Sequence, residues 1–194
     1  MSIVPSGSPS VFASSAQVGG ILEMYRLLLA ELVQIDARVI AMIAVLAAFV
    51  HGARLWGWYS RRVWAVPLLW VLILGYAWLV LGFALQALAQ FGWIAAPPAL
   101  HAFAAAIGVL SLGMMSRVAL GHTGRLLQPA RVMTWAFASI NLAMLLRVFG
   151  PLLLPALASF AIVGAGLLWL AAFAIFVWVY WPILIRARVD GRPG

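Results

Sequence analysis

Histidine is the principal candidate metal ligand in this sequence, because cysteine is absent. That absence excludes disulfides, thiolate-bound metals, iron–sulfur clusters and zinc fingers, and leaves His, Met and Tyr as ligands for haem iron or another transition metal. His101 and His122 are 21 residues apart, which corresponds to about 31 Å along a helix. They cannot bind the same metal ion within one chain, so we expect two separate sites.

A stripe of polar, small and soft residues connects these two histidines. His101, Gly108, Met115 and His122 recur at heptad spacing, and such a series drifts only about 60° around an ideal helix. Gly108 would let a neighbouring helix or a flat cofactor approach closely, although simple helix packing explains the same pattern. The third histidine, His51, is interpreted as a packing or interface residue.

Two arginines interrupt apolar stretches, so each needs either an anionic partner or a position from which its side chain can reach the lipid headgroups. Arg117 and Arg147 would each cost at least about 2.5 kcal/mol in the membrane interior on insertion scales. The predicted spans contain no acid, so a cofactor carboxylate such as a haem propionate, or a lipid headgroup, is the more available partner. For Arg117, snorkelling to the headgroups is the alternative.

The segment Gly121-His122-Thr123-Gly124-Arg125 follows the same apolar stretch. Its two glycines are typical of a helix that ends in a left-handed residue and then turns sharply, with exposed backbone N–H groups. Such a turn suits an anion or a fixed imidazole. Paired carboxylates, a Ser–His–acid set, a Walker loop and a GxGxxG context are all missing, so no conventional catalytic constellation is recognised.

The composition indicates a membrane protein. Apolar residues make up 66% of the 194 residues and charged residues only 8%, which rules out a soluble globular domain. The net charge of +8 comes from arginines that interrupt apolar runs, whereas nucleic-acid binding requires basic residues clustered on a polar face. We therefore predict no nucleic-acid partner and interpret the arginines as topology signals.

The chain is predicted to be all-α, a polytopic transmembrane helical bundle in which residues 21–194 form the bundle. We expect residues 1–20 to be flexible, without the features of a signal peptide, and residues 21–36 to form an amphipathic interfacial helix. A span at 21–36 would raise the number of crossings from five to six. Five apolar stretches approach or exceed the length needed to cross a bilayer: 37–58, 63–90, 98–120, 132–149 and 151–185.

The arginines alternate between the connections of these spans. The connections at 54–62, 121–131 and 186–194 are basic, whereas those at 91–97 and 150–154 carry no arginine. By the positive-inside rule, the basic connections and the C-terminus are predicted to be cytoplasmic and the N-terminus to be outside. Tryptophans near the span ends are interpreted as an interfacial belt, and Ser139 and Asn141 as donors of interhelical hydrogen bonds.

The stretch 101–125, HAFAAAIGVLSLGMMSRVALGHTGR, resembles the signature of the NnrS family of bacterial membrane proteins. The similarity includes the opening His101, Gly108, the Met-x-Arg step at Met115 and Arg117, and the final LGHTGR. It extends from about Trp64 to the tail at Arg188. Members of the family are longer, and the chain looks like their C-terminal portion.

The resemblance implies a haem- and copper-containing protein of the bacterial inner membrane, linked to nitric oxide stress and denitrification. His101, His122 and Met115 are then expected to ligate metal, and Arg117 and Arg125 to compensate cofactor charge. Gly108, Gly121, Thr123 and Gly124 complete the expected cofactor-binding set. The alternative is a non-catalytic scaffold or half-length subunit that forms a homo-oligomer or packs against partner helices; a transporter ranks below both.

Overall fold

A computed structural model describes residues 36–189 of the chain. The expected flexible segment 1–20 lies outside the described residues, as does the expected interfacial helix at 21–36 except for Asp36. The chain divides into two units at Asp36, and only the second, which begins at Ala37, is described below.

Five long helices make up this unit, all apolar and long enough to cross a membrane. They are joined by short connections, two of which contain 3-10 turns: η1 (Arg61–Ala65) and η2 (Pro155–Leu157). The predicted all-α transmembrane bundle is therefore confirmed for the described part of the chain. The helices are α2 (Ala37–Trp58), α3 (Pro67–Gln90), α4 (Pro97–His122), α5 (Arg131–Leu153) and α6 (Ala158–Leu184).

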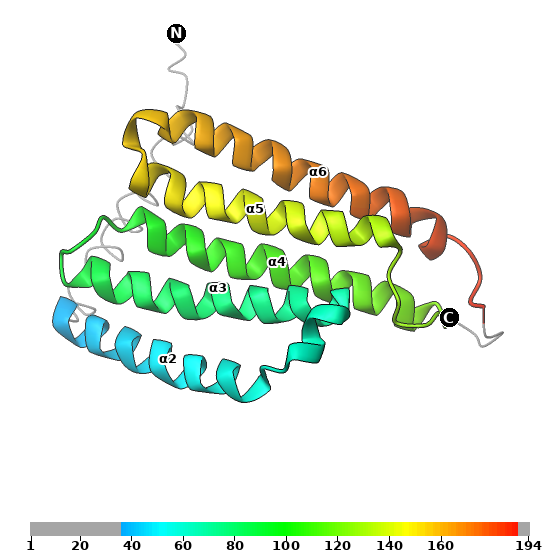
Figure 1. The fold of residues 1–194 in the computed structure, drawn as a ribbon, viewed down its shortest axis with the longest axis horizontal. Coiled ribbons are helices and arrows are strands. Elements are labelled where there is room, and N and C mark those ends of the chain that lie inside the picture. Colours follow the sequence, from blue (N-terminus) through cyan, green and yellow to red (C-terminus); the bar gives the residue numbers. More distant parts are fainter. Residues whose placement is uncertain (1–35, 190–194) are drawn as a thin grey trace, which may run out of the picture. The chain divides into compact units, whose positions relative to one another are not determined.

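Each helix packs against the one before and the one after it, and successive helices run in opposite directions (Figure 1). The core is centred on α3, α4 and α5, with alanines of α4 fully buried. The two outer helices, α2 and α6, are mostly exposed. Exposed apolar side chains on these helices are the expected contact with lipid, because helices satisfy their backbone hydrogen bonds internally.

Local sequence explains where the helices begin and end. Proline occupies the first turn of α3 and α4, where its missing N–H is not needed. After α3 the chain turns at Gly92, whose φ is 76°. The Trp93 N–H then donates to the Leu88 carbonyl, as in the standard glycine termination of helices.

The helix bounds agree with the predicted spans except at the start of α3, which begins at Pro67 instead of Val63, and around the last connection. The helix α5 continues through Pro151 to Leu153, and the break comes at Leu154 and Pro155. The last span therefore begins at Pro155, and α6 continues through Pro182 to Leu184. A proline in the last turn removes one hydrogen bond but does not stop a helix that ends two residues later.

The antiparallel order places the connections at two opposite ends of the bundle (Figure 1). We call the end formed by residues 59–66, 123–130 and 185–189 the basic end, because it carries Arg61, Arg62, Arg125, Arg186 and Arg188. The opposite end is formed by 91–96 and 154–157, which contain no arginine. The three basic connections therefore lie on the same side of the bundle.

Candidate functional site

The two histidines of α4 lie far apart. His101 is in the second turn of the helix and His122 is its last residue, so they occupy opposite ends of the bundle. No group of three or more His, Cys, Asp or Glu side chains capable of holding a metal occurs within the described range 36–189. One metal ion in one chain therefore cannot bind both histidines, and within the described residues neither has a second histidine beside it.

The stripe on α4 faces the surface of the bundle for most of its length. His101 and Gly108 are half-buried, whereas Met115 and His122 are exposed. A Cβ atom placed on Gly108 would lie 3.6 Å from Trp169 Nε1 of α6 and 3.7 Å from Ile140 Cδ1 of α5. The middle of the stripe is thus covered by α5 and α6, while the part toward the basic end is open.

A cavity of about 290 Å³ lies between α4, α5 and α6 on this face. Its walls are small or apolar apart from one guanidinium, that of Arg147, which is half-buried. Ala104, Gly166 and Trp169 are exposed, so the cavity opens to the surface of the bundle. The lining residues are Ala104, Met144, Arg147, Ala165, Gly166 and Trp169.

His101 lies at the edge of this cavity. It precedes the lining residue Ala104 by about one turn of α4, and its ring interacts with the backbone of Arg147. The Met144 thioether and the Arg147 guanidinium therefore line one cavity, and the His101 imidazole lies next to Arg147. Imidazole and thioether suit haem iron or copper, and a guanidinium suits a carboxylate, so these residues fit such a group.

Sequence reasoning identified His101, Gly108 and Arg147 but not how they combine with Met144 and Trp169. Met144 and Arg147 are three residues apart on α5, and this spacing places them on one helix face. That signal was available in the sequence. The contribution of Trp169 depends on how α6 packs, which no local pattern indicates.

The basic end holds the other expected site residues. Arg117, Gly121 and His122 are exposed, and Arg125 is half-buried. Thr123 is buried, and its hydroxyl is satisfied because it donates to the Ala119 carbonyl at 2.7 Å. Exposure of Arg117 in the last turns of α4 agrees with the snorkelling alternative, in which the side chain reaches the headgroups.

His51 takes part in an aromatic cluster between α2 and α3. Its Nδ1 lies 2.5 Å from the Tyr76 hydroxyl, and its ring stacks on Phe83 with centroids 5.5 Å apart. Arg54, one turn later, lies over the Trp58 ring at 4.9 Å. The His51 contacts connect α2 to α3 and agree with the interpretation of His51 as an interface residue.

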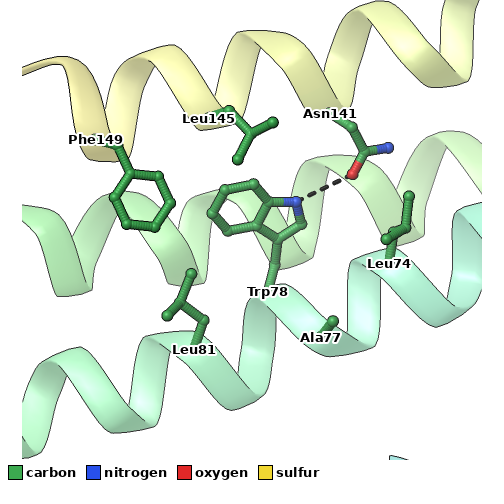
Figure 2. Close-up of a pocket in the computed structure, with 7 residues that line it drawn as sticks. All are labelled: Leu74, Ala77, Trp78, Leu81, Asn141, Leu145 and Phe149. Atoms are coloured by element: carbon green, nitrogen blue, oxygen red, sulfur yellow. Dashed lines mark hydrogen bonds between the residues drawn. The ribbon is translucent and has the colours of Figure 1, made fainter.

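Asn141 makes the interhelical hydrogen bond expected of it, but as an acceptor. Trp78 Nε1 of α3 donates to Asn141 Oδ1 of α5 at 3.1 Å (Figure 2), and Asn141 Nδ2 donates to the Phe137 carbonyl at 2.8 Å. The two side chains border a cavity of about 210 Å³ whose other walls are apolar. Because their polar groups pair with each other, we assign them a structural role.

Comparison with known proteins adds one match. A family model described as NnrS protein matches residues 8–188 of the chain. This range extends well beyond the similarity seen from Trp64 onward. Comparison with curated proteins found no match, and neither did comparison with solved structures.

Proposed function

Because the chain belongs to the NnrS family, we propose that it is a multi-pass protein of the bacterial inner membrane that binds haem or copper. We further propose that it acts in nitric oxide stress or denitrification, with its C-terminus in the cytoplasm. The observation that carries the binding proposal is the placement of His101 beside Arg147 at the edge of the cavity between α4, α5 and α6.

Each polar or soft side chain at this cavity has a separate role in the proposal. His101 would supply the imidazole ligand, with Met144 as a second donor from α5. Arg147 would hold an anionic substituent such as a propionate, which also relieves the cost of a guanidinium in an apolar wall. A bound haem iron or copper would supply redox chemistry at this cavity.

His122 is the metal ligand of a second site in this proposal, at the basic end. Met115 precedes it by seven residues on α4 and is likewise exposed. Arg117 and Arg125 would compensate charge only for a cofactor held at this end, since His101 lies at the other end of the helix. The support for this second site is the LGHTGR segment with its Met-x-Arg step.

Purification in detergent from haem-replete cells tests the proposal. A pyridine haemochrome spectrum and metal analysis should show haem or copper in the wild-type protein. His101→Ala should lower the content, whereas His51→Gln, which changes a histidine of the α2–α3 cluster, should not. A colourless, metal-free wild-type preparation would overturn the proposal, and unchanged content in both His101→Ala and His122→Ala would overturn the ligand assignment.

A second candidate is a non-catalytic scaffold or subunit that packs against partner helices. The favouring observation is the exposed apolar face of α2, which includes Met42, Ile43, Leu46 and Phe49, all at least 60% exposed. Chemical crosslinking in native membranes separates the two candidates. A protein without cofactor that crosslinks through α2 supports the scaffold, and a monomer that contains cofactor contradicts it.

A further inference from the structure

A third cavity, of about 590 Å³, lies at the basic end between the 123–130 connection and the end of α6. Its walls are mainly aliphatic, with Leu120, Leu126, Val179 and Ile183 among them. Arg125 is the charged side chain that lines it. An apolar cavity with a single cation at its edge suits an amphiphilic anion.

The backbone fixes Arg125 at this position. Gly124 has a φ of 71°, its N–H donates to the Gly121 carbonyl, and the Arg125 N–H donates to the Leu120 carbonyl at 2.9 Å. This is the pair of bonds that ends a helix at a left-handed glycine. The Val189 N–H donates to the Thr123 carbonyl at 3.2 Å, so the segment after α6 also holds the turn.

Two donors in this region are buried without a hydrogen-bond partner. Arg125 Nη1 is one, and the hydroxyl of Tyr180, a lining residue that is 1% exposed, is the other. The Ser116 hydroxyl lies beside it and donates its own hydrogen to the Leu112 carbonyl at 2.8 Å, but the Ser116 oxygen can still accept, so Arg125 is the donor that depends on a ligand. Buried donors without an acceptor are costly, above all on a charged group.

The charges of the described residues around Arg125 favour a negatively charged ligand. Residues 37–189 contain no Asp or Glu, so this part of the chain supplies no carboxylate to Arg125. Arg117, Arg131 and Arg186 add positive charge at the same end. Basic cavities between transmembrane helices at a cytoplasmic surface are typical binding sites for anionic lipid headgroups.

We propose that this cavity binds an anionic phospholipid, with Arg125 and Tyr180 donating hydrogen bonds to its phosphate. The aliphatic wall formed by α4 and α6 would accommodate the start of an acyl chain. This site is separate from the His101 cavity, because His101 and Arg125 lie at opposite ends of α4, but it shares Arg125 with the second site proposed at His122. Lipid binding can therefore fail while cofactor binding at His101 holds, and the reverse.

The test uses the purified full chain in mixed micelles with equal amounts of phosphatidylglycerol and phosphatidylcholine. Native mass spectrometry then counts the lipids retained. The wild-type protein should prefer phosphatidylglycerol by about tenfold, because the choline cation of phosphatidylcholine offsets the attraction between its phosphate and Arg125. Arg125→Gln should abolish the preference. Tyr180→Phe should lower the amount of phosphatidylglycerol retained about threefold, as for one neutral hydrogen bond, and keep the preference, because both lipids carry a phosphate.

Arg131→Gln provides the matched control, because Arg131 is an exposed cation at the same end that does not line the cavity. It should keep the preference. Helix content and elution volume verify that each variant is folded. Equal preference in wild type and Arg125→Gln, or no preference in wild type, would overturn the proposal. Displacement of the lipid by inorganic phosphate would overturn the assignment to a lipid. The acyl-chain contacts of a lipid should keep it bound when phosphate competes for Arg125.

Discussion

The turn after α4 depends on one glycine. Gly124 has a positive φ of 71°, which an L side chain adopts only at a cost of about 1–2 kcal/mol. Gly124→Ala should therefore lower the free energy of unfolding by about that amount. It should also disturb the position of Arg125, which follows directly. Denaturant titration of the detergent-solubilised protein, followed by tryptophan fluorescence, measures the change.

Gly121 is the matched control for this substitution. It lies in the last turn of α4, and a Cβ atom placed there meets nothing within 4 Å. Because alanine is also the better helix former, Gly121→Ala should leave stability unchanged or raise it slightly. An equal loss of stability in both variants would contradict the role assigned to the positive φ of Gly124.

Polar residues inside the bundle illustrate what residue type alone predicts. An asparagine in an apolar helix is expected to form an interhelical hydrogen bond, and Asn141 does so. Its partner, Trp78, is 63 residues away in the sequence. Tryptophans near the span ends can be assigned to the interface, but Trp78 lies in the interior of α3, where the sequence gives no indication of its partner.

At the scale of elements, the glycines at which helices pack most closely do not include Gly108, the glycine of the stripe on α4. Gly108 has room for a Cβ atom, whereas a Cβ on Gly75, Gly113 or Gly150 would come within 3.0 Å of a neighbouring helix. The contact at Gly150 is the tightest, at 2.5 Å from Ala161 Cβ of α6. The α5–α6 pair therefore meets at that glycine.

Gly150→Ala should force α5 and α6 apart. Neither Ala161 nor the new methyl group has a flexible end that can move aside, and overpacking of this kind costs about 1–3 kcal/mol. We expect a lower thermal unfolding midpoint in detergent. Gly164→Ala, on α6, adds a methyl group into open space and should not lower the midpoint. A Gly150→Ala protein as stable as the wild type would mean that the two helices are not packed this closely.

At the scale of the whole molecule, the arrangement of charge supports one orientation in the membrane. The basic connections lie at one end of the bundle (Figure 1), as the positive-inside rule requires for cytoplasmic loops. The chain has no cysteine, so single cysteines can be introduced without background. Ser60, beside Arg61 at the basic end, and Trp93, in the opposite connection and 74% exposed, are suitable positions.

An impermeant maleimide should label Trp93→Cys on intact spheroplasts. It should label Ser60→Cys only after the membrane is permeabilised, because that residue faces the cytoplasm in the proposed orientation. Labelling in the reverse order would contradict the orientation and would place the Arg125 cavity on the outer surface. Both residues labelled from the same side would contradict the antiparallel order of α2, α3 and α4.

Composition and the positions of charge and proline were enough to predict five spans, their approximate bounds and the side on which the basic connections gather. These properties follow from short stretches of chain, since hydropathy, helix starts and loop charge are local. The expected residues of the N-terminal segment remain predictions, because they lie outside the described range. The metal ligands also remain predictions, because the structure shows only which residues surround them.

The juxtaposition of side chains from different helices could not be predicted in the same way. The structure places His101 next to Arg147 and bonds Trp78 to Asn141. It also places Arg125 and Tyr180 in the wall of one cavity. These placements depend on the rotation and register of α3, α4, α5 and α6. When a helix is apolar on all sides, its sequence gives little indication of which face packs toward the core. Small residues such as Gly150 set that choice through close packing, which is a property of two helices in contact and not of either sequence alone.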